Sequence, residues 1–331
     1  MNISVIGSGG WGTAIASLLV QKGHAVTLWS WKQEESDAIR ENRENKEFLP
    51  GITLPDGIIY TADLKAAAKS DLVVIACPSK AFESTVRALS VYLSPETPIV
   101  NLTKGIADTM ERFSEVIRRI CPQNPVVILS GPSHAEEVAR KIPTTVVAAS
   151  ENAEAARKVQ DAFMMPWFRV YTAKDVIGVE LGAALKNVIA LCAGIMDGLG
   201  FGDNSKAALM TRGLAEMTRL GVAMGASPAT FSGLSGIGDL IVTCTSMHSR
   251  NRRAGILIGQ GKSVKDALNE VHMVVEGVYA AESAYKLAKK FNVEMPIVEA
   301  AYRVLFENGS PKEEALGLMQ REKKEESDPI Q

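Results

Sequence analysis

The chain has 331 residues, of which 46% are hydrophobic and 22% are charged, and its formal net charge is -2. This length accommodates two domains of ordinary size. The composition lacks the basic excess that neutralises phosphates along a strand, so we expect no nucleic-acid partner. The start shows no secretory signal, and no uninterrupted apolar run is long enough to span a bilayer. We therefore expect a cytoplasmic protein with no stable membrane insertion.

The cysteines and histidines show no metal-binding pattern. Cys77, Cys121, Cys192 and Cys244 are widely spaced and form no CxxC pair. This spacing predicts free thiols in a reducing compartment rather than disulfides or a zinc site. The four histidines form no HExxH motif, so we expect no metal.

The first half of the chain alternates short β-branched runs with helix-like segments. The runs typical of buried strands are ISVIG, AVTLW, DLVVIACP, TPIVNLT, PVVILSG and TTVVAAS. Such alternation predicts a doubly wound α/β domain, with a parallel sheet and helices on both of its faces.

The second half has a different texture, with long helical segments and few β-rich runs after about Asp175. We expect a dinucleotide-binding α/β domain of the Rossmann type over residues 1–176 and a mainly α-helical substrate and catalytic domain over residues 177–320. The charged stretch 321–331 is predicted to be a disordered tail.

A glycine-rich turn follows the first predicted strand directly and opens the first predicted helix. In ISVIGSGGWGTAIASLL, the residues Gly7, Gly9 and Gly12 have GxGxxG spacing. Gly7 permits the tight turn, Gly9 lets the backbone approach a pyrophosphate, and Gly12 lets the helix pack close to the sheet. The pyrophosphate would lie at the positive end of the helix dipole. This context favours a Rossmann-type domain that binds NAD or NADP over a glycine turn without a ligand.

The segment after the second predicted strand bears on the choice of cofactor. NAD-specific folds usually place an acid there to bind the ribose 2′-hydroxyl. This chain has Ser30, Trp31 and Lys32 instead, so no carboxylate would repel a 2′-phosphate and Lys32 could pair with one. We expect Trp31 and Lys32 to lie at the cofactor site and NADPH to be accepted; the alternative for Lys32 is a solvated surface lysine.

Two further loops follow predicted strands, where open α/β sheets bind their ligands. Lys104 follows IVNLT, and the loop from Gly131 to Ala135 follows VVILS. Ser133 and Glu136 also match the S-x-x-E capping box, so Ser133 has an alternative reading as a helix cap.

A lysine stands in the middle of the apolar helical segment VELGAALKNVIALCAGIM. The helical neighbours of Lys186 are Gly182, Ala183, Ile189 and Ala190, and none is a carboxylate. Most of them are small, which would leave space for a bulky ligand beside the ammonium. The alternative is a lysine that reaches solvent or pairs with a distant acid.

A polar and basic cluster follows in GLSGIGDLIVTCTSMHSRNRRAG. Asp239 is predicted to cap a helix or to face a site, and SRNRR is predicted to begin another helix with a guanidinium suited to a phosphate. Three arginines within four residues cannot all face one ligand. We expect Arg250 and Asn251 to point inward together, and Arg252 or Arg253 to be solvated.

These groups together suggest an enzyme that transfers a hydride. Reduction of a ketone develops an alkoxide, which needs a proton donor and nearby positive charge. Lys186 can supply both, because partial burial and the charges of Lys104 and Arg250 would each lower its pKa. Lys104 would hold the substrate's oxygen atoms, and Arg250 would hold a phosphate.

The chain resembles bacterial NAD(P)-dependent glycerol-3-phosphate dehydrogenase. The resemblance rests on GSGGWGTA, NLTKG, SGPSHAEEVA, GVELGAALKNVIAL, GFGDNSKAALMTRGLAEM, GLSGIGDLIVTCTS, SRNRR and VVEG, which span nearly the whole chain in order. It implies reversible reduction of dihydroxyacetone phosphate to sn-glycerol 3-phosphate with NADPH or NADH, supplying glycerophospholipid synthesis. It also implies that Lys186 is the catalytic proton donor or acceptor.

The resemblance also implies the binding residues. Substrate contacts would be made by Lys104, Gly131, Ser133, Lys186, Asp239, Ser249, Arg250 and Asn251. Beyond the glycines Gly7, Gly9 and Gly12, cofactor contacts would be made by Gly10, Trp11, Lys104, Ala135, Arg250, Val274 and Glu276. Asn187 and Thr243 fall where related enzymes place polar active-site groups. This chain departs from many relatives at Trp31-Lys32, where they carry Arg or His, and at Ser133, which is often Thr.

Two other functions remain open from the residues alone. One is a related dehydrogenase acting on β-hydroxy acids, whose carboxylate Arg250 could also bind. The other is a non-catalytic dinucleotide sensor whose helical domain binds a protein. The apolar surface of the helical half also suggests a homodimer.

Overall fold

The computed structural model describes residues 1–323, 325 and 326, and it divides into two compact units. Unit 1 comprises Met1–Thr103 and Glu111–Val176, and unit 2 comprises Lys104–Met110 and Ile177–Gln331. The short segment that begins at Lys104 therefore belongs with the helical second half of the chain. The predicted tail 321–331 includes residues 324 and 327–331, which lie outside the described residues.

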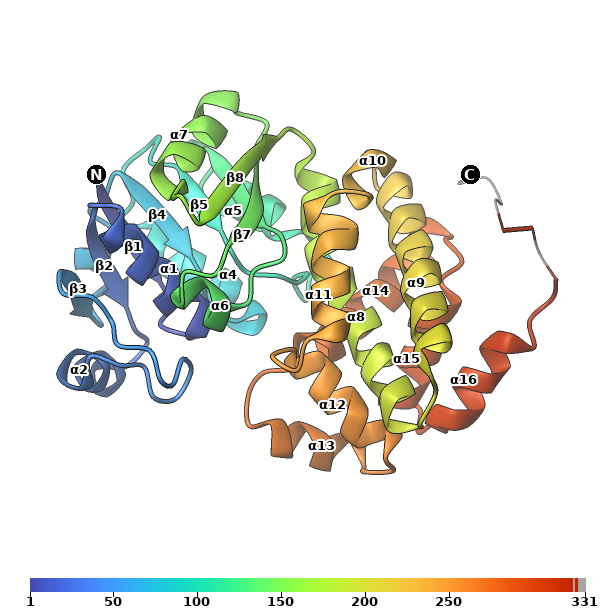
Figure 1. Cartoon of the computed structure of the whole chain (residues 1–331). Helices are drawn as coiled ribbons and strands as arrows, with labels where there is room; N and C mark the ends of the chain where they lie inside the picture. The colour runs from blue at the N-terminus through green and yellow to red at the C-terminus, as the bar shows by residue number, and fades with distance from the viewer. Residues whose placement is uncertain (324, 327–331) are drawn as a thin grey trace. The chain divides into compact units, whose positions relative to one another are not determined.

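Unit 1 is built on one eight-stranded sheet with the order β3-β2-β1-β4-β5-β6-β7-β8 (Figure 1). The strands are β1 (Asn2–Ile6), β2 (Ala25–Trp29), β3 (Ile58–Thr61), β4 (Leu72–Ile75), β5 (Ile99–Asn101), β6 (Val126–Ser130), β7 (Thr144–Ala149) and β8 (Phe168–Ala173). All neighbouring strands pair in parallel except β6 and β7, which are antiparallel. The predicted α/β class is thereby confirmed.

Two strands and one strand direction differ from the sequence prediction. The missed strands β3 and β8 mix buried with exposed or partly exposed residues, so they lack the continuous apolar run that marks a central parallel strand. The expected all-parallel sheet was wrong at β7. Only the five-residue helix α6 (Ala135–Ala139) lies between β6 and β7, and at 1.5 Å per residue it spans about 8 Å. A helix of that length does not carry the chain back along the whole of β6, and β7 pairs with β6 in the antiparallel direction.

Helices cover both faces of this sheet, as predicted. α1 (Gly10–Gln21) contacts α6 and α7 (Ala153–Phe163) on one face. On the other face α4 (Phe82–Ser90) contacts α3 (Leu64–Ala67) and α5 (Phe113–Ile120), and the 3-10 turn η1 (Ser79–Ala81) leads into α4. α2 (Gln33–Asn42) packs beside β3. Ile3, Ile15 and Phe163 are examples of the almost wholly buried core between the sheet and α1.

Unit 2 is helical throughout its described regular elements. These are α8 (Val176–Gly198), α9 (Asp203–Ala223), α10 (Pro228–Phe231), the π turn η2 (Leu234–Gly238), α11 (Asp239–Thr245), α12 (Arg250–Gly259), α13 (Val264–Val271), α14 (Glu276–Phe291), α15 (Pro296–Phe306) and α16 (Pro311–Met319). α8 and α12 approach closely through facing glycines. A Cβ on Gly194 would lie 2.1 Å from the Arg252 carbonyl oxygen, and a Cβ on Gly255 would lie 2.1 Å from that of Leu191.

By length and composition, α8 is apolar enough to cross a membrane, with a mean hydropathy of 1.7 over its most apolar window. The sequence prediction concerned uninterrupted apolar runs, and the charged residues Glu180 and Lys186 interrupt this helix. In addition, 94% of that window is buried inside the protein. α8 is accordingly the central core helix of unit 2, packed on every side by the helices that follow it.

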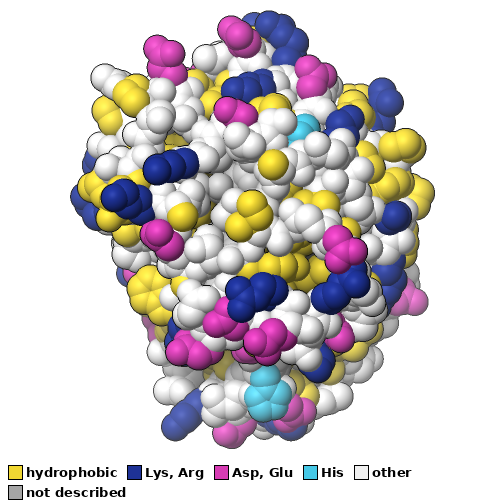
Figure 2. Space-filling model, turned by 90° about the vertical axis from the view of Figure 1, so that its left-hand side faces the viewer, with side chains coloured by type: hydrophobic (Ala, Val, Ile, Leu, Met, Phe, Trp, Pro, Cys, Tyr) yellow, Lys and Arg dark blue, Asp and Glu magenta, His cyan; other side chains and the backbone are white. Residues whose placement is uncertain are grey.

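The surface shown in Figure 2 carries both signs of charge in close alternation. Arg40 pairs with Asp37 at 2.6 Å, and Arg87 pairs with Glu83 at 2.6 Å. Exposed pairs of this kind contribute about 0.5 kcal/mol or less each to stability. All four cysteines are free thiols, as predicted.

Candidate active site

The Lys186 side chain is buried in unit 2 and is only 5% exposed. Its Nζ donates to Asp239 Oδ1 at 2.6 Å and to Thr243 Oγ1 at 2.8 Å. Asp239 and Thr243 lie one turn apart at the start of α11, so both side chains face α8. These bonds exclude the alternative that Lys186 reaches solvent. They show instead that Lys186 pairs with an acid distant in sequence, Asp239.

Burial lowers the pKa of Lys186 to about 7, from 10.5. The charge of Asp239 opposes this shift, and the nearby charge of Lys104 adds to it. Desolvation therefore wins over the ion pair, because a buried ammonium loses its hydration on all sides. The direction agrees with the sequence argument, although Arg250 is not among the leading causes.

Asp239 binds two lysines at once. Its Oδ2 accepts from Lys104 Nζ at 2.8 Å, while its Oδ1 accepts from Lys186. Asp239 is 1% exposed, whereas the Lys104 side chain is 18% exposed. Burial alone would raise the pKa of Asp239, but Lys104 and Lys186 together hold it below the ordinary value. With Lys186 protonated, the three residues form a compact cluster that carries one net positive charge, which suits an anionic substrate.

The small neighbours of Lys186 serve packing rather than a ligand. A Cβ on Gly182 would lie 2.4 Å from the Ser235 carbonyl oxygen, so η2 occupies that side of α8. Ala183 and Ala190 are also fully enclosed. The expectation of ligand space on this side of the helix was wrong, because the π turn that precedes α11 fills it and brings Asp239 to Lys186.

A chain of side-chain amides joins three helices next to Lys186. Asn251 Nδ2 donates to Asn187 Oδ1 at 2.9 Å, and Asn251 Oδ1 accepts from the Gly277 backbone N–H at 2.8 Å. Asn187 follows Lys186 on α8, and Gly277 lies in the first turn of α14. The structure thus brings Asn251 close to α8 and places Glu276 beside it at the start of α14. Val274 precedes that helix and is 38% exposed.

The SRNRR segment begins α12 as predicted, and Ser249 is its N-cap. Ser249 Oγ accepts from the Arg252 backbone N–H at 3.2 Å. Arg250 is the first helical residue and is partly buried. Of the two arginines for which solvation was expected, Arg252 or Arg253, the structure excludes Arg252, because its Nε donates to Asp197 on α8 at 2.8 Å. Arg253 is partly buried too.

The glycine turn in unit 1 has the predicted form. Gly7 has φ +119° and a Cβ there would lie 2.8 Å from the Ala76 backbone. A Cβ on Gly12 would lie 1.9 Å from the Gly7 carbonyl oxygen, whereas a Cβ on Gly9 would meet nothing within 4 Å. Gly9 therefore borders open space at the start of α1, which fits the close approach of a pyrophosphate.

Two other predicted cofactor residues adjoin this turn. A Cβ on Gly10 would lie 3.8 Å from Ala135 Cβ, so the first turns of α1 and α6 meet. Trp11 packs against the sheet core, and its buried indole Nε1 has no hydrogen-bond partner among the described protein atoms.

The loop after β6 differs from the predicted capping box. Ser133 Oγ donates to the Gly131 carbonyl oxygen at 2.9 Å, and the residue that precedes α6 is His134. The helix starts one residue later than the motif requires, so Ser133 is not its cap. Gly131 has φ +146°, and a Cβ there would lie 3.0 Å from the backbone of β7.

The residues after β2 lie where the sequence places them. Trp31 is 74% exposed and stacks edge-on against Trp29, with ring centroids 6.2 Å apart. Lys32 is exposed and precedes α2, and Glu34 and Glu35 stand in the first turn of that helix.

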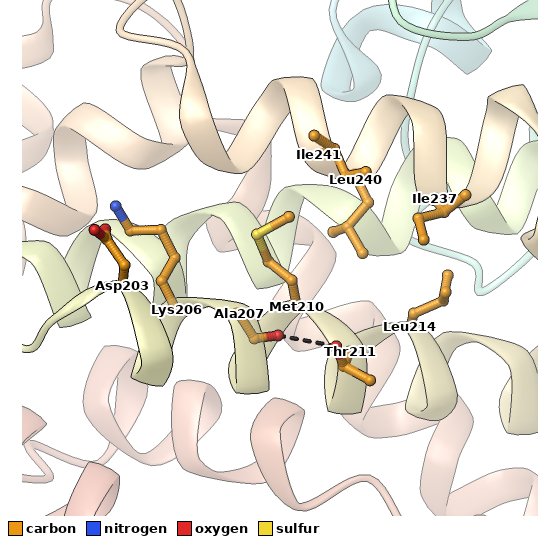
Figure 3. A pocket seen from close by; sticks show the side chains of 9 residues that line it. All are labelled: Asp203, Lys206, Ala207, Met210, Thr211, Leu214, Ile237, Leu240 and Ile241. Carbon is orange, nitrogen blue, oxygen red and sulfur yellow. Dashed lines mark hydrogen bonds between the residues drawn. The ribbon is translucent and has the colours of Figure 1, made fainter.

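A separate pocket of about 370 Å³ lies between α9 and α11 (Figure 3). In Figure 3 the side chains of Ile237, Leu240 and Ile241 face Met210 and Leu214 across it. None of the predicted site residues lines this pocket. Asp239 and Thr243 face Lys186 from one side of α11, and the pocket lies on the other side of that helix.

Sequence reasoning missed two buried polar residues in particular. Glu216 on α9 is 2% exposed and accepts from the backbone N–H groups of Ile297 at 2.8 Å and Val298 at 3.2 Å. Asn45 in unit 1 is 3% exposed and binds the glycine turn. The position of Glu216 offered one indication of its burial. It follows Gly213 by three residues on a helix, so the two residues share one face of α9, and that face is buried.

A dinucleotide turn at the start of α1 and a buried lysine of lowered pKa define a nicotinamide-dependent oxidoreductase. Models of known families match both parts of the chain. The NAD-dependent glycerol-3-phosphate dehydrogenase N-terminus matches residues 2–156, and the corresponding C-terminus matches residues 175–315. The chain belongs to the NAD(P)-dependent glycerol-3-phosphate dehydrogenase family.

Individual relatives agree over nearly the full length. The chain is 56% identical over 328 residues to glycerol-3-phosphate dehydrogenase (NAD(P)+) of a Thermoanaerobacter species, covering 98% of this chain and 99% of the relative. It is 51% identical over 329 residues to that of Desulfitobacterium hafniense, covering 99% and 94%. The crystal structure of glycerol-3-phosphate dehydrogenase from Coxiella burnetii has a TM-score of 0.94 at 37% identity, covering 97% of this chain and 99% of that one.

Proposed function

We propose that this chain reversibly reduces dihydroxyacetone phosphate to sn-glycerol 3-phosphate with NADPH or NADH, and that Lys186 supplies the proton. The observation that carries the assignment of Lys186 is its burial against Asp239 and Thr243 with a pKa of about 7. A group with that pKa can both give and take a proton near neutral pH, as a reversible reaction requires.

The proton transfer follows from the hydrogen bonds of the cluster. When bound, the reduced nicotinamide supplies the hydride. An ammonium has three N–H donors, and Lys186 gives two of them to Asp239 and Thr243. Its third N–H protonates the alkoxide oxygen as that oxygen gains charge. The neutral amine then stays bound to the same two side chains until it regains a proton from solvent.

The other residues of the cluster recognise the anionic substrate. Lys104 stabilises the developing oxyanion, because its ammonium is fixed by Asp239 and remains partly accessible. Arg250 binds the phosphate at the start of α12, where the helix dipole also favours an anion. Ser249 and Asn251 contribute chiefly by fixing α12, since their side chains already bind Arg252, Asn187 and Gly277. Gly131 and Ser133 complete the proposed substrate set.

The cofactor is proposed to lie along the glycine turn of unit 1. Gly7, Gly9, Gly10 and Gly12 shape the turn, and Trp11 and Ala135 border it. Trp31 and Lys32 would bind the adenosine end, with Lys32 pairing with a 2′-phosphate. The other proposed contacts, from unit 2, are Lys104, Arg250, Val274 and Glu276.

We further propose a cytoplasmic enzyme that supplies glycerol 3-phosphate for glycerophospholipid synthesis and that forms a homodimer. The exposed apolar side chains of Ile237, Ile241 and Met247, between 38% and 58% exposed, support association through unit 2. Light scattering of wild-type protein and of Ile241→Lys tests this assembly, since a dimer through this surface would dissociate in the variant.

Oxidation of NADPH and NADH, followed by the absorbance of the reduced nicotinamide, tests the function. We expect turnover with dihydroxyacetone phosphate and almost none with dihydroxyacetone, because the uncharged ketone cannot bind Arg250. Turnover only with β-hydroxy acids or their keto forms would contradict the proposal in favour of a related dehydrogenase. Cofactor binding without turnover of any small ketone would support a sensor instead.

A further inference from the structure

The connection between α2 and β3 forms a strap over residues 43–54 that lies against the glycine turn. Its residue Asn45 is 3% exposed, and its Nδ2 donates to the Ser8 carbonyl oxygen at 2.7 Å and to Thr13 Oγ1 at 2.8 Å. Asn45 Oδ1 accepts from the Phe48 backbone N–H at 3.1 Å. One side chain therefore ties the strap to both sides of the turn.

The strap itself is held firmly by unit 1. Leu49 and Leu54 are 0% and 1% exposed and belong to the core against the sheet. The Leu49 N–H donates to the Asn45 carbonyl oxygen at 2.8 Å, and the Leu54 N–H donates to that of Arg43 at 2.8 Å. A Cβ on Gly10 would lie 2.5 Å from the Phe48 carbonyl oxygen, so the strap also touches the first residue of α1.

These bonds fix the orientation of one peptide group in the glycine turn. The Ser8 carbonyl oxygen accepts from Asn45 Nδ2 and from Thr13 Oγ1, the latter at 3.1 Å. The Ser8–Gly9 peptide is trans, and in a trans peptide the N–H points opposite to the C=O. The Gly9 N–H is therefore directed away from the strap, on the side available to an anion at the start of α1.

The strap does not pack tightly against α2. A cavity of about 160 Å³ lies between α2 and the strap, and Ser8, Asn45 and Phe48 are among its lining residues. Loss of the Asn45 amide would open this cavity to the turn and leave the Ser8 carbonyl with one donor fewer.

We propose that Asn45 is a positioning residue for the dinucleotide, which orients the Ser8–Gly9 peptide through the Ser8 carbonyl and Thr13. This inference rests on the proposed binding of the cofactor at the glycine turn. Asn45 itself touches neither cofactor nor substrate. Its loss weakens the pyrophosphate contact that NADPH and NADH share, and it leaves the proton-transfer cluster of unit 2 unchanged.

The test measures cofactor dissociation constants by the quenching of tryptophan fluorescence, together with kcat, in Asn45→Ala. We expect the constants for NADPH and NADH to rise about tenfold and by the same factor, since the Ser8 carbonyl loses the donor that Asn45 supplies and keeps only that of Thr13. At saturating cofactor, kcat should stay within about twofold of wild type.

Asn124→Ala is the matched control. Asn124 also donates through its amide to two backbone carbonyls, those of Ser94 at 3.0 Å and Thr97 at 2.9 Å, but it precedes β6 at the amino end of the strand. We expect this variant to lose thermal stability and to keep wild-type cofactor affinity. If Asn45→Ala also lost only stability, with both dissociation constants unchanged, the positioning role would be wrong.

Thr13 provides a second arm that does not depend on the folding of Asn45→Ala. Thr13→Val removes the hydroxyl that connects Asn45 to Ser8 and should weaken both cofactors severalfold, whereas Thr13→Ser keeps the hydroxyl and should bind them normally. Equal affinities in Thr13→Val and Thr13→Ser would overturn the inference. Failure of the wild-type protein to bind either cofactor would instead refute the proposed function on which it rests.

Discussion

The carboxylate of Asp239 bridges two ammonium groups, with Lys186 Nζ 2.6 Å from Oδ1 and Lys104 Nζ 2.8 Å from Oδ2. Without this carboxylate, two positive charges would face each other in the core of unit 2. Asp239 therefore allows two protonated lysines to coexist, and in that state the cluster keeps one net positive charge for the substrate.

Asp239→Asn tests this bridge. The amide keeps the shape of the side chain but removes the charge that compensates both lysines. We expect the free energy of unfolding to fall by about 3 kcal/mol, because a buried charge loses its partner. Urea unfolding measures the change, and Asp37→Asn serves as control because its pair with Arg40 is on the surface. Equal, small losses in both variants would argue against the bridge.

The pH dependence of the two reaction directions follows from the lowered pKa of Lys186, which burial brings to about 7. Reduction needs the ammonium form, so kcat/KM for dihydroxyacetone phosphate should fall as pH rises through about 7. Oxidation of glycerol 3-phosphate needs the neutral amine and should rise over the same range. Profiles that move in the same direction for both reactions would contradict this role.

The same shift predicts a pH dependence of stability. Because the pKa of Lys186 is lower in the folded protein than the ordinary 10.5, the unfolded chain binds more protons between about pH 7 and pH 10.5. The contribution of Lys186 to stability should therefore increase with pH across that window. Unfolding titrations of wild type and Lys186→Met should diverge in this sense, and parallel curves would show that the pKa is not shifted.

Lys32→Glu tests the cofactor assignment in unit 1. Lys32 is exposed just before α2, and a carboxylate at this position would repel a 2′-phosphate. KM for NADPH should increase about tenfold or more, while KM for NADH changes little. Lys69→Glu, an exposed lysine elsewhere in unit 1, is the control for net charge. Equal effects of Lys32→Glu on the two cofactors would refute the assignment.

Glu216→Ala tests a structural prediction in unit 2. Glu216 accepts the backbone N–H groups of Ile297 and Val298 at the start of α15, so its loss should cost about 2–3 kcal/mol of stability. Burial raises the pKa of Glu216 to about 7, from 4.5. The folded protein thus holds a proton that the unfolded chain releases between these values. The loss should be larger near pH 5 than near pH 8 in urea unfolding, and the reverse trend would contradict the raised pKa.

The sequence predicted those features that depend on local pattern. The glycine turn is an example, since a strand, three spaced glycines and a helix are adjacent in the chain. The N-cap of α12 at Ser249 is another. The central strands are rich in Val and Ile and almost wholly buried and were found, while β3 and β8 are partly exposed and were not.

Features that depend on distant contacts could not be predicted. The partner of Lys186 is 53 residues away, and only the π turn before α11 brings Asp239 to it. Arg252 or Arg253 was expected in solvent, because nothing near Arg252 in sequence indicates the carboxylate of Asp197 on α8. Asn45 stands in a polar loop whose role depends on contact with Ser8, 37 residues earlier.

The most direct test of the account is single-turnover reduction of dihydroxyacetone phosphate by wild type and Lys186→Met, with NADPH affinity measured in parallel. The methionine fills a similar volume but has no proton to give, and Asp239 keeps its pair with Lys104. We predict that the rate falls by about a hundredfold or more while NADPH binds as in wild type. A rate within about tenfold of wild type would show that another group donates the proton.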